Sequence, residues 1–111
     1  MLKPLTDDFI SGKRRAIQYL GGMESLYYKH LKVFQNKYQD SHIKINRYVD
    51  HKEYEEAQRL THSIKGLAGT LGMSELESKC QTLETALNEG RYSELHPMLL
   101  EFQSALFKAI Q

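Results

Sequence analysis

Apolar side chains recur at steps of three and four residues along most of the chain, and no segment shows the sustained apolar–polar alternation of a half-buried strand. The pattern therefore predicts helices. The first is expected from about residue 6 or 7 to 20, and the second from 23 or 24 onward, with a break around 39–41 and a continuation to 49. Three more are expected over about 53–71, from 74 to about 88, and from about 93 to 110.

Glycines and capping residues mark the ends of these helices. Gly21 and Gly72 directly follow helical stretches, and glycine favours the C-terminus of a helix. Ser74 and Glu77 have the spacing of a capping box, and Ser93 is in position to cap the last helix. Because the connections are short, successive helices should run antiparallel. We expect an all-α fold, an antiparallel up-and-down four-helix bundle with an additional N-terminal helix.

Length and composition indicate one folded domain. The 111 residues suffice for a modest core but not for a kinase domain with its own nucleotide cleft. Hydrophobic residues make up 41% and charged residues 26%, as in a globular rather than a disordered chain. No apolar run reaches about 18 residues, so no transmembrane span is expected. The first residues also lack the apolar centre of a secretory signal.

Charge and cysteine content narrow the functional classes. The formal net charge is +1, from 15 basic and 14 acidic residues, which gives no electrostatic reason to expect nucleic acid or an anionic membrane as a partner. Cys80 is the only cysteine, so an internal disulfide and a cysteine-based zinc site are excluded. A reducing, cytoplasmic setting is the simplest expectation.

The most informative segment is HSIKGLAGTLG, which runs from His62 to Gly72. On a helical wheel, the expected core stripe lies more than about 100° from His62. That stripe consists of Ala57, Leu60, Ile64, Leu67, Ala68 and Leu71. The residues within about 60° of His62 are Glu55, Gln58, Arg59, Lys65, Gly66 and Gly69. His62 is therefore expected near the middle of an exposed polar face.

Two glycines and two cations share this face. Gly66 and Gly69 each cost roughly 1 kcal/mol of helix stability relative to alanine. One interpretation is that they keep the surface low, so that a partner's active site can approach the imidazole; the alternative is close packing against a neighbouring helix. Lys65 is placed to neutralise a phosphoryl group on the ring, and Arg59 is a second candidate for that role.

Imidazole suits phosphoryl transfer because its ordinary pKa of about 6.5 leaves a nucleophilic nitrogen at neutral pH. The other ring nitrogen needs an acceptor that fixes the tautomer. If the helices on either side of Gly72 are antiparallel, residues 82–84 should lie level with His62. Glu84 is the expected partner of the ring.

The segment HSIKGLAGTLG resembles the signature of histidine-containing phosphotransfer (HPt) domains, with Lys-Gly after the histidine and a closing Leu-Gly. Residues 20–34, LGGMESLYYKHLKVF, are similar to the family's Gly-Gly turn and second helix. Residues 83–95, LETALNEGRYSEL, are similar to its fourth helix and the loop that follows. The resemblance covers nearly the whole chain, so residues 1–111 are expected to form a single HPt domain.

The resemblance implies that His62 is phosphorylated, that Lys65 assists and that Gly66 makes room for the partner. Donor and acceptor would be aspartates of receiver domains, in response regulators or hybrid sensor kinases, whose bound magnesium organises transfer. The domain itself would be a monomeric phosphocarrier without kinase activity, metal or cofactor. Many family members have glutamine where this chain has Glu84. The expected partner-binding residues are Gln58, Arg59, Gly66 and Gly69.

Three other interpretations stay open. The phosphoacceptor domain of chemotaxis histidine kinases also contains HSIKG, and receives its phosphate from ATP through a separate kinase domain. A helical adaptor would bind partners through the same face and would tolerate His62→Gln. A metal-binding bundle is disfavoured, because the five histidines show no i, i+3 or i, i+4 pairing.

Overall fold

The computed structural model describes residues 12–110, and these residues form helices and turns without a strand. The expected all-α fold is confirmed. The elements are α2 (Lys13–Tyr19), α3 (Glu24–Tyr38), α4 (Ser41–Asp50), α5 (Tyr54–Thr70), α6 (Ser74–Asn88), the short 3-10 helix η1 (Tyr92–Glu94) and α7 (Leu95–Ile110).

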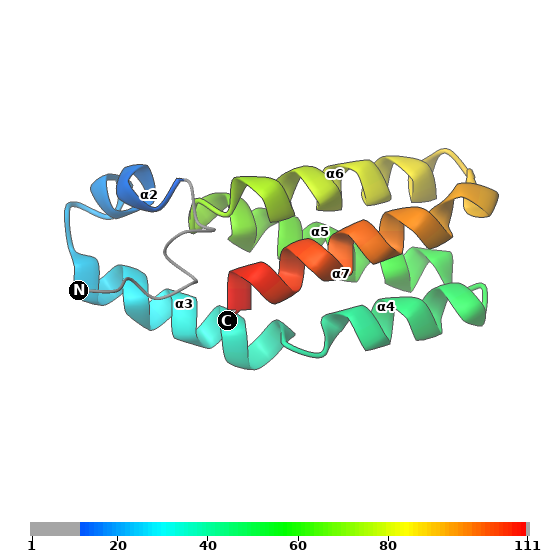
Figure 1. Ribbon diagram of the computed structural model, residues 1–111, viewed down its shortest axis with the longest axis horizontal. Helices are drawn as coiled ribbons and strands as arrows, with labels where there is room; N and C mark the ends of the chain where they lie inside the picture. The colour runs from blue at the N-terminus through cyan, green and yellow to red at the C-terminus, as the bar shows by residue number, and fades with distance from the viewer. Residues whose placement is uncertain (1–11, 111) are drawn as a thin grey trace.

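Four helical rods form the bundle. The first rod is α3 followed by α4, which lie end to end along one edge of the molecule (Figure 1) and are separated by the expected break at residues 39–40. The other rods are α5, α6 and α7; α5 packs between α4 and α6, and α7 packs against α6 and α4. The short helix α2 lies at one end of the bundle, beside α3 and the turn between α5 and α6 (Figure 1).

The core contains apolar side chains from every rod. Tyr27 and Phe34 of α3, Leu83 of α6 and Phe102 of α7 are fully buried. The Tyr27 hydroxyl donates a 2.8 Å hydrogen bond to the carbonyl of Leu71, which ties α3 to the end of α5. A buried hydroxyl of this kind needs a partner, so the bond fixes the level at which the two helices meet.

The expected core stripe of α5 is present. Ala57, Ile64 and Ala68 are buried, and the longer side chains of Leu60 and Leu67 pack at the core's edge. Thr61 is also fully buried, which the wheel did not predict. Its hydroxyl donates to the Ala57 carbonyl at 2.7 Å within the same helix, so this polar group enters the core with its hydrogen bond satisfied.

Two of the predicted helix caps are wrong. Ser74 is already helical, and the N-cap is Met73, without a side-chain capping bond. The reason is the tight closure of α5: the Met73 amide bonds the Ala68 carbonyl, and the Met73 side chain is buried. One residue thus ends α5 and begins α6. Ser93 likewise lies inside η1 instead of capping α7.

The helix α2 does not continue through Gly12, although the pattern predicts a helix there. Within the described residues it begins at Lys13, after Gly12, and the expected start at residue 6 or 7 lies outside them. The Gly12 amide donates to the Gly72 carbonyl at 2.8 Å. A Cβ on Gly72 would lie 2.3 Å from the Gly12 backbone, so only glycine permits this contact. The Gly12–Gly72 contact therefore anchors the start of α2 to the turn between α5 and α6.

Candidate functional site

His62 lies in the third turn of α5 with most of its side chain in solvent. The side chain is 68% exposed, as the wheel predicts for the polar face. Its Nδ1 atom lies 2.6 Å from the Glu84 Oε2 atom of α6. The ring is therefore held from one side by a neighbouring helix, while the rest of it projects away from the core.

Glu84 is a buried carboxylate, with only 9% of its side chain exposed. Burial raises the pKa of this carboxyl, but hydrogen bonds from Lys65 and then His62 outweigh burial, so the pKa lies below its ordinary value. Glu84 is thus ionised at neutral pH and can only accept hydrogen bonds. Nδ1 of His62 must then carry the proton and donate it, which leaves the Nε2 lone pair of the neutral ring facing solvent.

Lys65 is directed toward α6. Its Nζ atom donates to Glu84 Oε1 at 2.5 Å and to Gln81 Oε1 at 3.1 Å, and its side chain is 22% exposed. Gln81 in turn donates to the Thr85 hydroxyl at 3.0 Å. In the unphosphorylated chain the charge of Lys65 compensates that of Glu84, and a contact between Lys65 and a phosphoryl group stays a prediction.

The register between α5 and α6 explains how these side chains meet. His62 lies opposite Glu84, Lys65 opposite Gln81, and Gly69 opposite Glu77. Each step forward along α5 is matched by a step back along α6, as in an antiparallel pair. Polar side chains from the two helices therefore meet at successive levels along the pair.

The two glycines of the His62 face have different surroundings. A Cβ on Gly66 would have no described atom within 4 Å, so the surface one turn after His62 is open. A Cβ on Gly69 would lie 2.5 Å from the Glu77 carboxylate. The low-surface interpretation therefore fits Gly66. At Gly69 the space is taken by the movable carboxylate of the exposed Glu77, so neither an open surface nor close packing of the α6 backbone describes it.

Gln58 and Arg59 lie beside His62 in a shallow hollow, which Glu55, Ser63, Glu84 and Asn88 complete. The Arg59 guanidinium forms an exposed 3.0 Å ion pair with Glu56. Exposed pairs of this kind contribute roughly 0–1 kcal/mol, so Arg59 can leave Glu56 at little cost. The structure thus brings both residues to the histidine but gives Arg59 no contact with the ring.

The family model described as Hpt domain matches residues 29–111, which is most of the chain. The chain belongs to the Hpt domain family. No solved structure matches it. Hpt domains carry out histidine phosphotransfer in two-component signalling, and they do so as phosphocarriers without kinase activity of their own. They interact with receiver domains. The helix α2 precedes the matched residues.

Across residues 12–110, no group of three His, Cys, Asp or Glu side chains is arranged to hold a metal ion. In the same part of the chain, no helix is both long and apolar enough to cross a membrane.

Gln81 is the site residue that the pattern did not predict. Counting from the Gly72 turn pointed to residues 82–84 opposite His62, and Gln81 falls one residue outside that window. The predicted pairing of His62 with Glu84 could have revealed Gln81. In an antiparallel pair, the residue three after His62, which is Lys65, lies opposite the residue three before Glu84, which is Gln81. Thr85 follows from the same logic, as the i+4 neighbour of Gln81.

Proposed function

We propose that His62 accepts a phosphoryl group from the aspartyl phosphate of one receiver domain and passes it to the aspartate of another. The observation that carries this proposal is the Nδ1–Glu84 hydrogen bond of an otherwise exposed ring. It fixes the tautomer in which Nε2 is the nucleophile, and it leaves that atom accessible to a second protein.

The transfer step follows from this geometry. The Nε2 lone pair attacks the phosphorus, an Nε2–P bond forms, and the P–O bond to the receiver aspartate breaks with its electrons leaving on the carboxylate. The proton on Nδ1 stays in place, so the phosphorylated ring carries a positive charge next to Glu84. A buried anion at this position stabilises that charge as it develops. The reverse attack by a second receiver's aspartate regenerates the neutral ring.

Lys65 and Gly66 have supporting roles in the proposal. Lys65 limits the cost of burying the Glu84 charge, and it can turn toward the phosphoryl oxygens because its Nζ and the His62 ring contact the same carboxylate. Gly66 leaves space for the receiver's active site. The magnesium ion is expected on the receiver, and the single cysteine is consistent with a reducing, cytoplasmic setting.

A two-step transfer assay tests the function. A receiver domain phosphorylated with acetyl phosphate is mixed with the wild-type chain and then with a second receiver. Labelled phosphate should move from the first receiver to the chain and then to the second receiver. The variant His62→Gln should abolish both transfer steps. The matched control is Ser104→Ala, at an exposed position of α7 outside the hollow beside His62. Equal transfer by His62→Gln would place the phosphate on another residue, and no transfer by either protein would favour an adaptor.

The same assay separates the chemotaxis alternative. A chemotaxis kinase core with ATP replaces the first receiver. Label that enters the chain from the kinase core but from no receiver would identify a kinase phosphoacceptor domain instead of a relay domain.

A further inference from the structure

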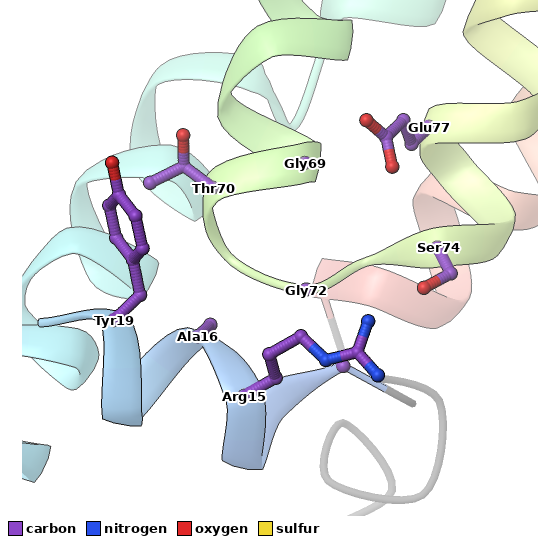
Figure 2. Close-up of a pocket in the computed structure, with 9 residues that line it drawn as sticks. Arg15, Ala16, Tyr19, Gly69, Thr70, Gly72, Ser74 and Glu77 are labelled. Carbon is purple, nitrogen blue, oxygen red and sulfur yellow. The ribbon is translucent and has the colours of Figure 1, made fainter. Parts of the chain in front are cut away.

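A cleft lies beside α2, next to the end of α5 and the start of α6. The cleft has a volume of about 390 Å³. Figure 2 shows Arg15 and Tyr19 on α2, Ser74 and Glu77 on α6, and Gly69 on α5 around it. Gly69 lies opposite Glu77 in the register that pairs His62 with Glu84, so the cleft lies farther along the same pair of helices as the His62 site.

Two side chains of opposite charge, those of Arg15 and Glu77, face this cleft. Arg15 and Glu77 are both exposed, and neither makes an ion pair or a side-chain hydrogen bond with a described residue. Each could meet a charged group without first breaking a contact. Tyr19, at the rim, is 85% exposed, although tyrosine is a residue that favours protein interfaces.

The cleft lies within reach of any protein that docks over His62. Gly69 is seven residues past His62, or roughly 10 Å along the helix axis. A standard interface covers about 800 Å² on each partner, which corresponds to a disc about 16 Å in radius. A receiver centred on the His62 ring therefore reaches the Gly69 end of the cleft, where the Glu77 carboxylate lies and where Arg15 forms the facing wall (Figure 2).

We propose that this cleft selects among receiver domains, by fitting one that presents an acidic side chain to Arg15 and a basic side chain to Glu77. The inference rests on the proposed phosphotransfer. Charges near the edge of an interface steer encounter and exclude partners of the wrong sign more than they add affinity. The cleft combines α2, which precedes the family match, with α5 and α6, which lie inside it. It can therefore distinguish this chain from others that share the matched region.

Charge reversal on either wall tests the proposal. The probe is the receiver domain that exchanges phosphate fastest with the wild-type chain, taken from the receivers of the same genome. Arg15→Glu and Glu77→Lys should each lower the second-order rate constant of transfer by about tenfold, with an unchanged rate at saturating receiver. The loss should shrink at high salt, because screening weakens exposed charge pairs.

Three controls separate docking from chemistry and from net charge. Phosphoramidate, a small phosphodonor that needs no docking, should modify His62 equally in all variants. Glu101→Lys makes the same charge change as Glu77→Lys, but Glu101 lines neither the cleft nor the hollow beside His62, so this variant should transfer at the wild-type rate. The double variant Arg15→Glu/Glu77→Lys keeps the net charge of the chain. It should no longer exchange phosphate fastest with the receiver that the wild-type chain prefers.

The outcomes distinguish this inference from the proposed function. If wild-type chain exchanges phosphate but the Arg15 and Glu77 variants match Glu101→Lys, the cleft does not select receivers and the carrier role stands. If the variants slow all receivers equally, the cleft contributes to docking without selecting, and the inference is overturned. If the wild-type chain takes phosphate from no receiver, both proposals fail.

Discussion

At the scale of single residues, the site depends on a buried carboxylate shared by two donors. Glu84 accepts hydrogen bonds from His62 through one oxygen and from Lys65 through the other. A glutamine at this position has one acceptor oxygen and no charge, so it can keep the bond to His62 but cannot keep both contacts at equal strength. The carboxylate therefore contributes to stability and to the charge balance of the ring.

The variant Glu84→Gln should lower the free energy of unfolding by about 1–2 kcal/mol at pH 7, because a charge-assisted hydrogen bond becomes a neutral one. The folded-state pKa of Glu84 lies below the ordinary value of 4.5, so its stabilising contribution is present above that pH. It is lost as the pH falls through the folded-state pKa. Denaturant unfolding of both proteins between pH 7 and pH 3 should show their difference shrinking; a pH-independent difference would contradict the assignment.

At the scale of the elements, the glycine on the exposed face of α5 lowers the stability of the helix and leaves His62 accessible to a partner protein. Gly66 is in an ordinary helical conformation, with no described atom where a side chain would project. Nothing in the fold requires glycine there. Gly72 is different, because its φ of +77° and its contact with Gly12 both require the absence of a Cβ.

Gly66→Gln should therefore stabilise the domain and disable it. Replacing glycine in a helix interior raises the free energy of unfolding by about 0.5 kcal/mol, since glutamine has the better helix propensity. Transfer from a phosphorylated receiver should nevertheless fall sharply, because the side chain occupies the approach to Nε2. Gly66→Ala is the matched control and should retain most of the rate. Wild-type transfer by Gly66→Gln would refute the close-approach argument.

Gly72→Ala and Gly90→Ala form a matched pair. Both glycines follow a helix with positive φ and with the same closing hydrogen bonds, but a Cβ on Gly90 would have no described atom within 4 Å. Gly90→Ala should cost about 1 kcal/mol from backbone strain alone. Gly72→Ala should cost more in denaturant unfolding, because it also displaces the start of α2. Equal costs would show that the Gly12–Gly72 contact contributes little.

The helices and the exposed histidine could be predicted from the sequence because both depend on local periodicity. The capping of α6 could not, because Met73 is drawn into the core by the closure of α5, which is a tertiary effect. The surroundings of Gly69 could not be predicted either, since a helical wheel does not say which neighbouring side chain covers a face. Glu84 was reached by counting along an antiparallel pair, whereas Gln81 required the register itself.

At the scale of the whole molecule, Cys80 reports on cooperative opening. It is fully buried, and burial, followed by the charge of Glu84, raises the pKa of its thiol to about 12. The native thiol is thus neutral as well as inaccessible near pH 8, and only the thiolate reacts readily. Maleimide labelling of the native chain should proceed at the rate of global opening and accelerate in denaturant. Rapid labelling without denaturant would contradict the packing of α6.

The surface position of His62 determines how the whole domain can act. The bundle holds His62 on its surface, and Glu84 fixes one side of its ring. In the proposed function, the fold contributes this positioned nucleophile and a surface for docking.

The most direct test of the account is the location of the phosphate. The chain is incubated with a receiver domain phosphorylated by acetyl phosphate, and its phosphate is mapped by mass spectrometry before and after brief acid treatment. We expect one phosphoryl group on His62 that is lost in acid, as a phosphoramidate bond requires, and none on His62→Gln. Acid-stable phosphate on another residue, or no phosphate at all, would contradict the central claim.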